Sequence, residues 1–230
     1  MPIELTLIIQ QMYIIGPDSL PIILLTSFFI GLVFSLQIVK EFLALNASSF
    51  VGSVLTITFI RELSPVLTSI ILIGKISSYF TSELASMKIT EQIDVLYVLG
   101  ISPFNYLLMP RIIAFILMTP ILNIFSFLSS VTSSAFFCFT LYSIHPSQFF
   151  DSAFIHLDIM DIIKSIIKSF IFGFITALIS CFLGINVKGG SKEVGMSTTV
   201  SVVISLVCTF IINFILSYYM FDRVDPFLST

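Results

Sequence analysis

Residues 51–76 read VGSVLTITFIRELSPVLTSIILIGKI, and this stretch decides the fold class. It is largely apolar and is interrupted near its middle by two adjacent charges, Arg61 and Glu62. A helix needs roughly 20 mostly apolar residues to cross the hydrocarbon core of a bilayer. The stretch therefore predicts a membrane-spanning helix. Similar apolar runs occur at residues 20–38, 112–141, 162–182 and 200–221.

The composition of the whole chain agrees with a lipid environment. Of its 230 residues, 57% are hydrophobic and 10% are charged, and the mean hydropathy is +1.11. Soluble domains carry about a quarter charged residues, because their surface faces water. We therefore predict an all-α integral membrane protein, a single domain over residues 1–230 with about five spans. A bend or a short re-entrant segment near residues 129–134 would raise the count to six.

The N-terminal residues 1–15 predict a short amphipathic helix in the membrane interface, not a secretory signal. The segment mixes Glu4 and two glutamines with Ile, Leu and Met, and it lacks a basic n-region. The distribution of Lys and Arg favours a cytoplasmic N-terminus. The basic residues are then Lys75, Lys88, Arg111, Lys188 and Lys192 on the cytoplasmic side, and Lys40 and Arg223 on the other.

The charges inside the second run require partners from other helices. Arg61 and Glu62 lie roughly 15 Å into the membrane, counted from residue 51 at about 1.5 Å per residue. Ionisable groups at that depth are costly and mark a functional site by default. Adjacent helical residues point about 100° apart, so these two cannot pair with each other. Pro65, one turn further on, should bend the helix and free backbone carbonyls.

Two residues of later spans are candidates for these partners. Lys168 and Asn213 fall at similar depths in the fourth and fifth runs. We predict one intramembrane polar layer of Arg61, Glu62, Lys168 and Asn213. The alternative is that Lys168 extends to the interface and that Asn213 makes an ordinary interhelical hydrogen bond.

The polar stretch between the second and third runs predicts a short helix at residues 90–99. Thr90 can cap its start, Glu91 and Asp94 suit its first turn, and Gly100 can end it. The apolar face of this helix is formed by Ile93, Leu96 and Tyr97. A short helix with defined ends between two spans can serve as a lever. The plainer interpretation is an interfacial turn.

The sequence contains no pattern for nucleotide binding or catalysis. The loop KGGSKE at 188–193 does not fit G-x-x-x-x-G-K-[ST], and no strand precedes it. His145 and His156 match no metal-ligand spacing, and we interpret the 142–161 connection, including Asp161, as a solvated loop. No nucleophile–base pattern occurs. We therefore predict a protein that is not an enzyme, holds no metal or cofactor and has no nucleic-acid partner. Any ATP must be hydrolysed by another subunit.

Two motifs are specific, RELSPVLT at 61–68 and MKITEQID at 87–94. They and several shorter motifs resemble the MlaE-type ABC permeases, a family that includes the plastid TGD permease and a plastid-encoded relative. The resemblance covers about residues 51–221. The shorter motifs are GK at 74–75, ELAS at 83–86, LGISP at 99–103, PR at 110–111, KSFIFG at 168–173 and GMSTT at 195–199.

The resemblance implies a lipid permease. In such systems a permease homodimer works with a separate ABC ATPase and an MCE-domain lipid-binding protein, and together they move phospholipid or a related lipid between membranes. The membrane would be the plastid (chloroplast) envelope or a bacterial inner membrane. Spans one, two and five would line a lipid cavity between the protomers. Residues 90–99 would be the coupling helix on the ATPase, and its contact residues would be Lys88, Thr90, Glu91, Gln92 and Asp94.

The chain departs from this family at two positions. The family typically has Arg at the position of Val200 and Asp at the position of Asn213. Within the predicted layer, Arg61 and Lys168 then face Glu62 alone. This surplus positive charge suggests a preference for an anionic lipid headgroup.

Two other functions fit parts of the sequence. An ion-coupled carrier would use Glu62 and Lys168 as a proton relay and would need no ATPase. A structural anchor of an envelope complex would tolerate charge substitutions in the layer. Identification of the proteins that co-purify with the chain would separate these from the permease.

Overall fold

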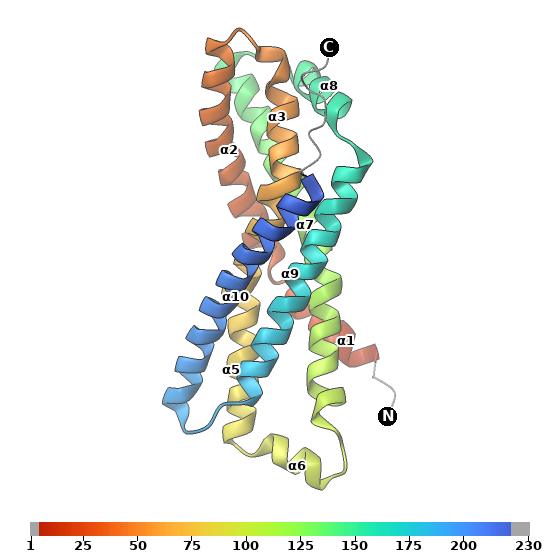
Figure 1. Cartoon of the computed structure of the whole chain (residues 1–230), viewed down its shortest axis with the longest axis vertical. Coiled ribbons are helices and arrows are strands. Elements are labelled where there is room, and N and C mark those ends of the chain that lie inside the picture. The colour runs from red at the N-terminus through yellow and green to blue at the C-terminus, as the bar shows by residue number, and fades with distance from the viewer. Residues whose placement is uncertain (1–4, 222–230) are drawn as a thin grey trace.

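Each apolar run of the sequence forms a helix in the computed structural model, which describes residues 5–221 (Figure 1). Five helical stretches of this part are long and apolar enough to cross a membrane, which confirms the predicted all-α membrane fold with five spans. The elements are α1 (Leu5–Ile15), α2 (Leu20–Ala44), η1 (Ser48–Phe50), α3 (Val51–Thr58), η2 (Phe59–Leu63), α4 (Ser64–Leu72), η3 (Ile73–Ser77), α5 (Ser78–Ile89), α6 (Gln92–Val98), η4 (Phe104–Leu108), α7 (Met109–Tyr142), α8 (Pro146–His156), α9 (Ile159–Ile185) and α10 (Ser191–Phe221).

Two sequence expectations fall partly outside this range. Residues 1–4 of the predicted interfacial segment and Arg223 are outside the described residues. The remainder of the N-terminal segment forms α1, which leaves the bundle at an angle to α2 (Figure 1). Its position in the membrane interface stays a prediction.

The third predicted span forms one continuous helix. The helix α7 runs without a break through residues 129–134, so the re-entrant segment considered from the sequence does not form. The serines of this region instead pack against α2. The Ser27 and Ser126 hydroxyls are 2.8 Å apart, and the Ser134 hydroxyl donates to the Gly31 carbonyl at 3.0 Å. Small polar residues let membrane helices approach closely and bond to each other, so these serines hold α2 to α7.

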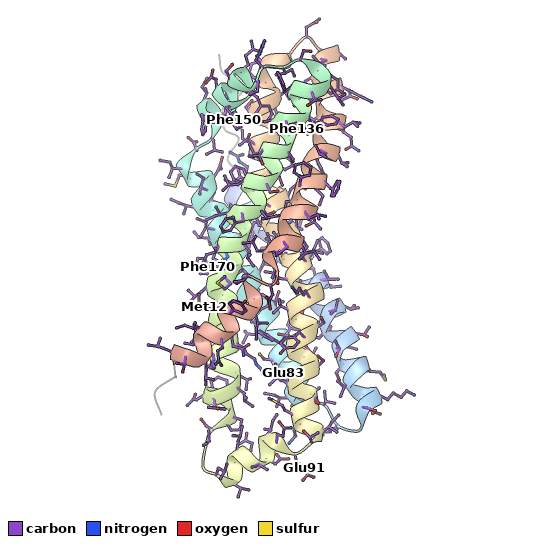
Figure 2. The ribbon with its side chains drawn as sticks, turned by 180° about the vertical axis from the view of Figure 1, so that it is seen from behind. Met12, Glu83, Glu91, Phe136, Phe150 and Phe170 are labelled. Atoms are coloured by element: carbon purple, nitrogen blue, oxygen red, sulfur yellow. The ribbon has the colours of Figure 1, made fainter. Side chains whose placement is uncertain are left out.

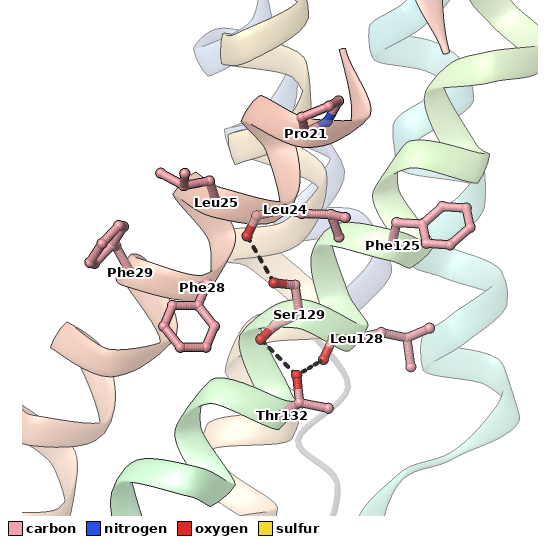
Figure 3. Close-up of a pocket in the computed structure, with 9 residues that line it drawn as sticks. All are labelled: Pro21, Leu24, Leu25, Phe28, Phe29, Phe125, Leu128, Ser129 and Thr132. Carbon is pink, nitrogen blue, oxygen red and sulfur yellow. Dashed lines mark hydrogen bonds between the residues drawn. The ribbon is translucent and has the colours of Figure 1, made fainter. Parts of the chain in front are cut away.

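A shallow groove of about 660 Å³ opens on the outside of the α2–α7 pair (Figure 3). Leucine and phenylalanine side chains such as Leu25 and Phe28 line most of it. Its two hydroxyls are turned to backbone carbonyls: Ser129 donates to Leu24, and Thr132 donates within its own helix (Figure 3). The groove is therefore an apolar surface of the kind that faces lipid.

The second span is one long helix with two π-helical segments. It runs from α3 to α5, and the π segments are η2 (Phe59–Leu63) and η3 (Ile73–Ser77). A π segment inserts an extra residue into the turn and often occurs at a functional site. The first of them contains Arg61 and Glu62. Pro65 lies directly after it, in the first turn of α4.

The last span carries a polar stripe on its inner side. Ser201, Ser205 and Thr209 are buried at 0–1% exposure, and Asn213 and Ser217 continue the spacing of four residues. Because a helix has 3.6 residues per turn, such a stripe drifts by about 40° at each step. The helix α10 crosses the bundle obliquely, and the drift follows this crossing (Figure 1). Ser201 therefore contacts Thr81 of α5 at 2.8 Å, and the stripe reaches η2 and α9 at its other end.

Two separate apolar cores fill the bundle on either side of a polar zone. One core joins α1, the start of α2, α5, α7 and α9 around Phe80 and Phe115. The other joins the end of α2, α3, α8 and the end of α7 around Phe59 and Phe149. Along α7, Asn123 and Ser126 separate these two cores. The buried polar residues thus form a zone between two apolar ends.

Candidate functional site

Glu62 is the centre of a hydrogen-bonded cluster formed by three helical elements. Its Oε2 accepts from the Lys168 ammonium at 3.1 Å and from the Asn213 amide at 3.2 Å. Its Oε1 accepts from the Ser217 hydroxyl at 2.7 Å. Glu62 belongs to η2, Lys168 to α9, and the other two residues to α10. The structure therefore brings Glu62, Lys168 and Asn213 together and adds Ser217.

Lys168 is completely buried, with 0% of its side chain exposed. Its ammonium donates to the Glu62 carboxylate, to the Ser217 hydroxyl at 2.8 Å and to the Arg61 backbone carbonyl at 3.0 Å. An ammonium has three N–H donors, and each of these three acceptors can take one. The alternative in which Lys168 extends to the interface is wrong.

The Arg61 carbonyl lies in the π segment η2, four residues before Pro65, which has no N–H to donate to it. The Lys168 ammonium supplies a donor in its place. The carbonyl that the sequence expected Pro65 to free is thus part of the cluster.

Arg61 turns its side chain to a different partner. Its Nη2 lies 2.8 Å from Oδ2 of Asp161, whose side chain is 2% exposed. The interpretation of Asp161 as a solvated loop residue is therefore wrong. The helix α9 begins at Ile159, earlier than the predicted 162, and this places Asp161 in its first turn. The surplus positive charge predicted for the layer is also wrong, because Asp161 pairs with Arg61 while Glu62 pairs with Lys168.

The spacing along the helices contains a signal for the residues that the sequence analysis missed. Asp161, Ser165 and Lys168 are spaced so that they lie on one face of α9. Ser217 follows Asn213 by four residues on α10. Residues three, four or seven positions from a buried charge on a helix are its candidates for contact.

A second polar link lies beside the Glu62 cluster. The Ser64 hydroxyl donates to Oδ1 of Asn123 at 2.6 Å, and the Asn123 amide donates to Ser165 at 2.9 Å. All three side chains are at most 2% exposed. This chain of hydrogen bonds joins α4, α7 and α9 at the level of the cluster.

The short helix α6 lies at the far end of the bundle, where Figure 2 labels Glu91. It begins at Gln92, two residues later than predicted, and the prediction that Thr90 caps it is wrong. Thr90 instead ends α5, and its hydroxyl donates to the Ser86 carbonyl at 2.9 Å. Glu91 occupies the cap position of α6 with a left-handed φ of 59°.

Gly100 ends α6 as predicted. Its φ is +73°, a conformation that glycine adopts without steric cost. The Ile101 amide donates to the Leu96 carbonyl at 3.0 Å, and the Gly100 amide donates to Tyr97 at 3.1 Å. These two bonds form a Schellman motif, which satisfies the last carbonyls of the helix.

The helix α6 turns most of its apolar residues outward. Ile93 is buried against the bundle, but Tyr97 is 66% exposed and does not share its environment as the sequence predicted. The exposed apolar residues of this region are Val95, Tyr97, Val98 and Leu99, with exposed fractions of 55–88%. Lys88 holds α6 to α5 through an ion pair with Asp94 at 2.9 Å. The tip of α6 therefore presents an apolar surface that the rest of the described residues do not cover.

The part of the second span that leads to α6 is polar. The helix α5 has the sequence SYFTSELASMKI, in contrast to the apolar α3 and α4. Just before it, Lys75 donates to the Asp18 carbonyl in the turn between α1 and α2. The helix α5 continues beyond this turn for about 18 Å at 1.5 Å per residue, packed on α9 and α10, and leads to α6 at the lower end of the bundle (Figure 1).

The sequence profile of the family described as Permease MlaE matches residues 8–219. The chain belongs to the MlaE permease family. Like other relatives of this family, it is an integral membrane protein, and it is the permease subunit of an ABC transporter. MlaE permeases of this kind occur in chloroplasts and in bacteria, as the relatives in Arabidopsis thaliana and Synechocystis illustrate.

Three relatives show how far the similarity extends. The probable ABC transporter permease protein ycf63 of Pyropia yezoensis is 50% identical over 214 residues, which are 93% of this chain and 81% of the relative. The protein of the same name from Porphyra purpurea is 49% identical over 221 residues, or 96% and 84%. The chloroplastic protein TRIGALACTOSYLDIACYLGLYCEROL 1 of Arabidopsis thaliana is 45% identical over 187 residues, or 81% and 53%.

Within this MlaE permease the described residues show no group of three or more His, Cys, Asp and Glu placed to hold a metal. His156 contacts the Ser152 carbonyl of its own helix at 3.2 Å.

Proposed function

We propose that this chain is the membrane subunit of an ABC-type lipid transporter that moves phospholipid or a related lipid between membranes. It works as a homodimer with a separate ATPase and an MCE-domain lipid-binding protein. The observation that carries the proposal is α6, a short helix with an exposed apolar surface at the end of the bundle. A permease driven by a separate ATPase needs such a contact.

The ATPase is proposed to bind at α6 and its flanks. Val98 and Leu99 form the exposed apolar tip, and Asp94 and Lys88 form an ion pair on the side. The contact residues expected from the sequence are Lys88, Thr90, Glu91, Gln92 and Asp94. Thr90 ends α5 and therefore lies at the corner where α6 begins.

A lipid substrate is supported by the surroundings of Glu62. Its side chain is 40% exposed, although its carboxylate is bonded to Lys168, Asn213 and Ser217. The helix α10 beside it carries exposed apolar residues such as Phe210 and Phe214. A polar centre open to an apolar surface suits a molecule with a polar headgroup and acyl chains. The Arabidopsis relative is itself named after a galactosyl lipid.

The homodimer is supported by the uneven burial of α10. Its inner stripe packs on α5 and α9, whereas Val203, Val207 and Phe214 are 52–75% exposed on the outside. A second copy placed against this face would enclose Glu62 between protomers. Native mass spectrometry of the purified complex should show two copies of the chain, and a single copy would contradict the homodimer.

The ion-coupled alternative would use the direct contact between Lys168 and Glu62. The family match favours coupling to an ATPase instead. Transport measurements distinguish the permease from the structural anchor, because an anchor would not transfer lipid.

The first test is capture of the partners by the tagged chain from native membranes. We expect an ABC ATPase and an MCE-domain protein with the wild type. Val98→Asp should lose the ATPase and keep the MCE protein, because it places a charge in the docking surface. Leu45→Asp makes the same kind of change at a residue that is 74% exposed in the turn after α2, and it should keep the ATPase. Equal ATPase capture by Val98→Asp and the wild type would refute docking at α6.

The second test is transport in proteoliposomes that contain the complete complex. Glu91→Lys or Asp94→Lys should uncouple ATP hydrolysis from lipid transfer while the protein remains folded. A labelled-lipid transfer assay and an ATPase assay on the same vesicles measure both activities. Normal transfer with normal ATPase stimulation in both variants would exclude a coupling role for these residues.

A further inference from the structure

A further ion pair, in which the arginine is buried, lies near α6, away from the Glu62 cluster. Arg111, in the first turn of α7, is 3% exposed, and its Nη2 lies 2.8 Å from Oε2 of Glu83 on α5. Figure 2 shows Glu83 on α5, above the corner that leads to α6. The helices α5 and α7 are the two that enter and leave the α6 segment. The pair therefore joins the two arms of this hairpin.

Aromatic packing reinforces the same junction. The Arg111 guanidinium carbon lies 5.5 Å from the centre of the Phe80 ring, within the range of a cation–π contact. Phe80 in turn packs edge-to-face on Phe115 of α7, with ring centres 6.2 Å apart. Phe80 is on the same side of α5 as Glu83, one turn earlier. Arg111 is thus fixed by a charge and by a ring, and both come from α5.

Each arm leads from this junction to the polar zone. The helix that carries Glu83 also carries Glu62, about 30 Å away at 1.5 Å per residue. On the other arm, Asn123 lies twelve residues after Arg111 and is bonded to Ser64, directly beside η2. The two antiparallel arms are therefore linked at both ends, by Glu83–Arg111 near α6 and by Ser64–Asn123 near Glu62.

We infer that the Glu83–Arg111 pair makes the two arms move as one body, so that movement of α6 reaches the Glu62 cluster. Both are positioning residues, since they act on the cluster through α5 and α7. The inference rests on the proposed docking of an ATPase at α6. The exposed pair Lys88–Asp94 orders only the α5–α6 corner and does not reach α7.

The test measures lipid transferred per ATP hydrolysed by the reconstituted complex. Glu83→Gln should lower this ratio by about fivefold or more, the usual range of a coupling free energy between sites, while ATPase capture stays normal. The exchanged pair, Glu83→Arg with Arg111→Glu, should restore much of the ratio. Glu41→Gln, at an exposed site near the end of α2, is the matched control and should have no effect.

A conservative variant keeps the test decisive if Glu83→Gln fails to assemble. Glu83→Asp retains the charge but shortens the side chain and lengthens the contact with Arg111. A reduced ratio in assembled Glu83→Asp complexes supports the inference, and a normal ratio overturns it. A wild-type complex without an ATPase or without ATP-driven transfer would instead refute the proposed function.

Discussion

The two partners at the centre of the polar cluster differ in their access to solvent or lipid. The Lys168 side chain is 0% exposed, and that of Glu62 is 40% exposed. A buried charge depends on its partner, because it has no water to replace the lost contact. Glu62 accepts hydrogen bonds from Asn213 and Ser217 in addition to Lys168. Removal of one partner should therefore have a different effect from removal of the other.

Glu62→Gln should be the more harmful of the two single changes. It leaves the Lys168 ammonium buried without its counter-charge, a situation that costs about 3–5 kcal/mol in other proteins. Lys168→Met should cost less, since Glu62 retains Asn213 and Ser217 as donors. Thermal unfolding of the purified protein in nanodiscs measures the order. The double variant should be more stable than Glu62→Gln alone, and a double variant less stable than this single one would contradict the pairing.

Asn213 allows a second prediction at this scale. Its amide donates to Glu62 at 3.2 Å, and a hydrogen bond to a charged group contributes about 1.5–3 kcal/mol. Asn213→Ala loses this bond. Asn213→Asp should be worse than Asn213→Ala, because it places a second carboxylate against Glu62. The same unfolding measurement compares the two, and an Asp variant as stable as the wild type would show that the cluster accepts another negative charge.

The sequence was sufficient for one part of this site. Depth along the apolar runs was enough to group Glu62, Lys168 and Asn213, because lipid forces buried charges to similar levels. Depth could not identify Asp161, which lies at the end of a helix and is reached by the long Arg61 side chain. Ser217 carries no charge, so its role appeared only when α10 was placed against η2.

At the scale of single elements, α6 is flanked by two residues with a left-handed backbone conformation, one a glutamate and the other a glycine. Gly100 has a φ of +73° and Glu91 a φ of 59°. Glycine adopts this conformation freely, whereas a residue with a Cβ pays roughly 1–2 kcal/mol for it. The backbone strain therefore lies at Glu91, at the start of α6 and beside the proposed docking residues.

A pair of opposite substitutions tests this difference. Gly100→Ala should destabilise the α6 segment by roughly 1 kcal/mol, since a Cβ there meets nothing within 4 Å and only the backbone conformation is affected. Glu91→Gly should stabilise the same segment by a similar amount. Hydrogen exchange of the α6 amides measures both changes. Equal exchange in the two variants would contradict the conformational assignment.

The elements could be predicted from hydrophobic runs, but their ends could not. The second predicted span stopped at residue 76, whereas its helix continues to Ile89. The end of an apolar run indicates where a helix leaves the lipid, but the helix itself can continue into water. The predicted cap at Thr90 failed because α5 runs to Ile89 and Thr90 is its C-cap, so that Glu91 takes the cap position of α6.

At the scale of the whole molecule, the bundle depends on close approach of helices. Gly31 of α2 packs so tightly on α7 that an added Cβ would overlap the Ser133 side chain and lie 2.5 Å from the Ser130 carbonyl. The hydroxyl-to-carbonyl bonds between these helices require this separation.

Gly31→Ala should therefore destabilise the bundle even though alanine is the better helix former. The overlap involves backbone, so the two helices must separate; overpacking of this kind costs about 1–3 kcal/mol. Gly195→Ala is the matched control, since a Cβ at Gly195 in α10 meets nothing within 4 Å. It should be neutral or stabilising by up to about 1 kcal/mol. Unfolding temperatures of both variants check the contrast, which fails if the two move in the same direction.

The wide separation in sequence of the Glu62 partners has a consequence for how the protein is made. Glu62 precedes Lys168 by 106 positions and Asn213 by 151. Translation therefore produces Glu62 first, then Lys168, and Asn213 last. A nascent chain that has not yet reached Asp161 lacks the groups that later bond to Arg61 and Glu62. When α9 arrives, its lysine enters the membrane beside a carboxylate that is already in place. Ribosomal order thus spares the buried ammonium an interval without a counter-charge, and α10 closes the cluster as the final step of insertion.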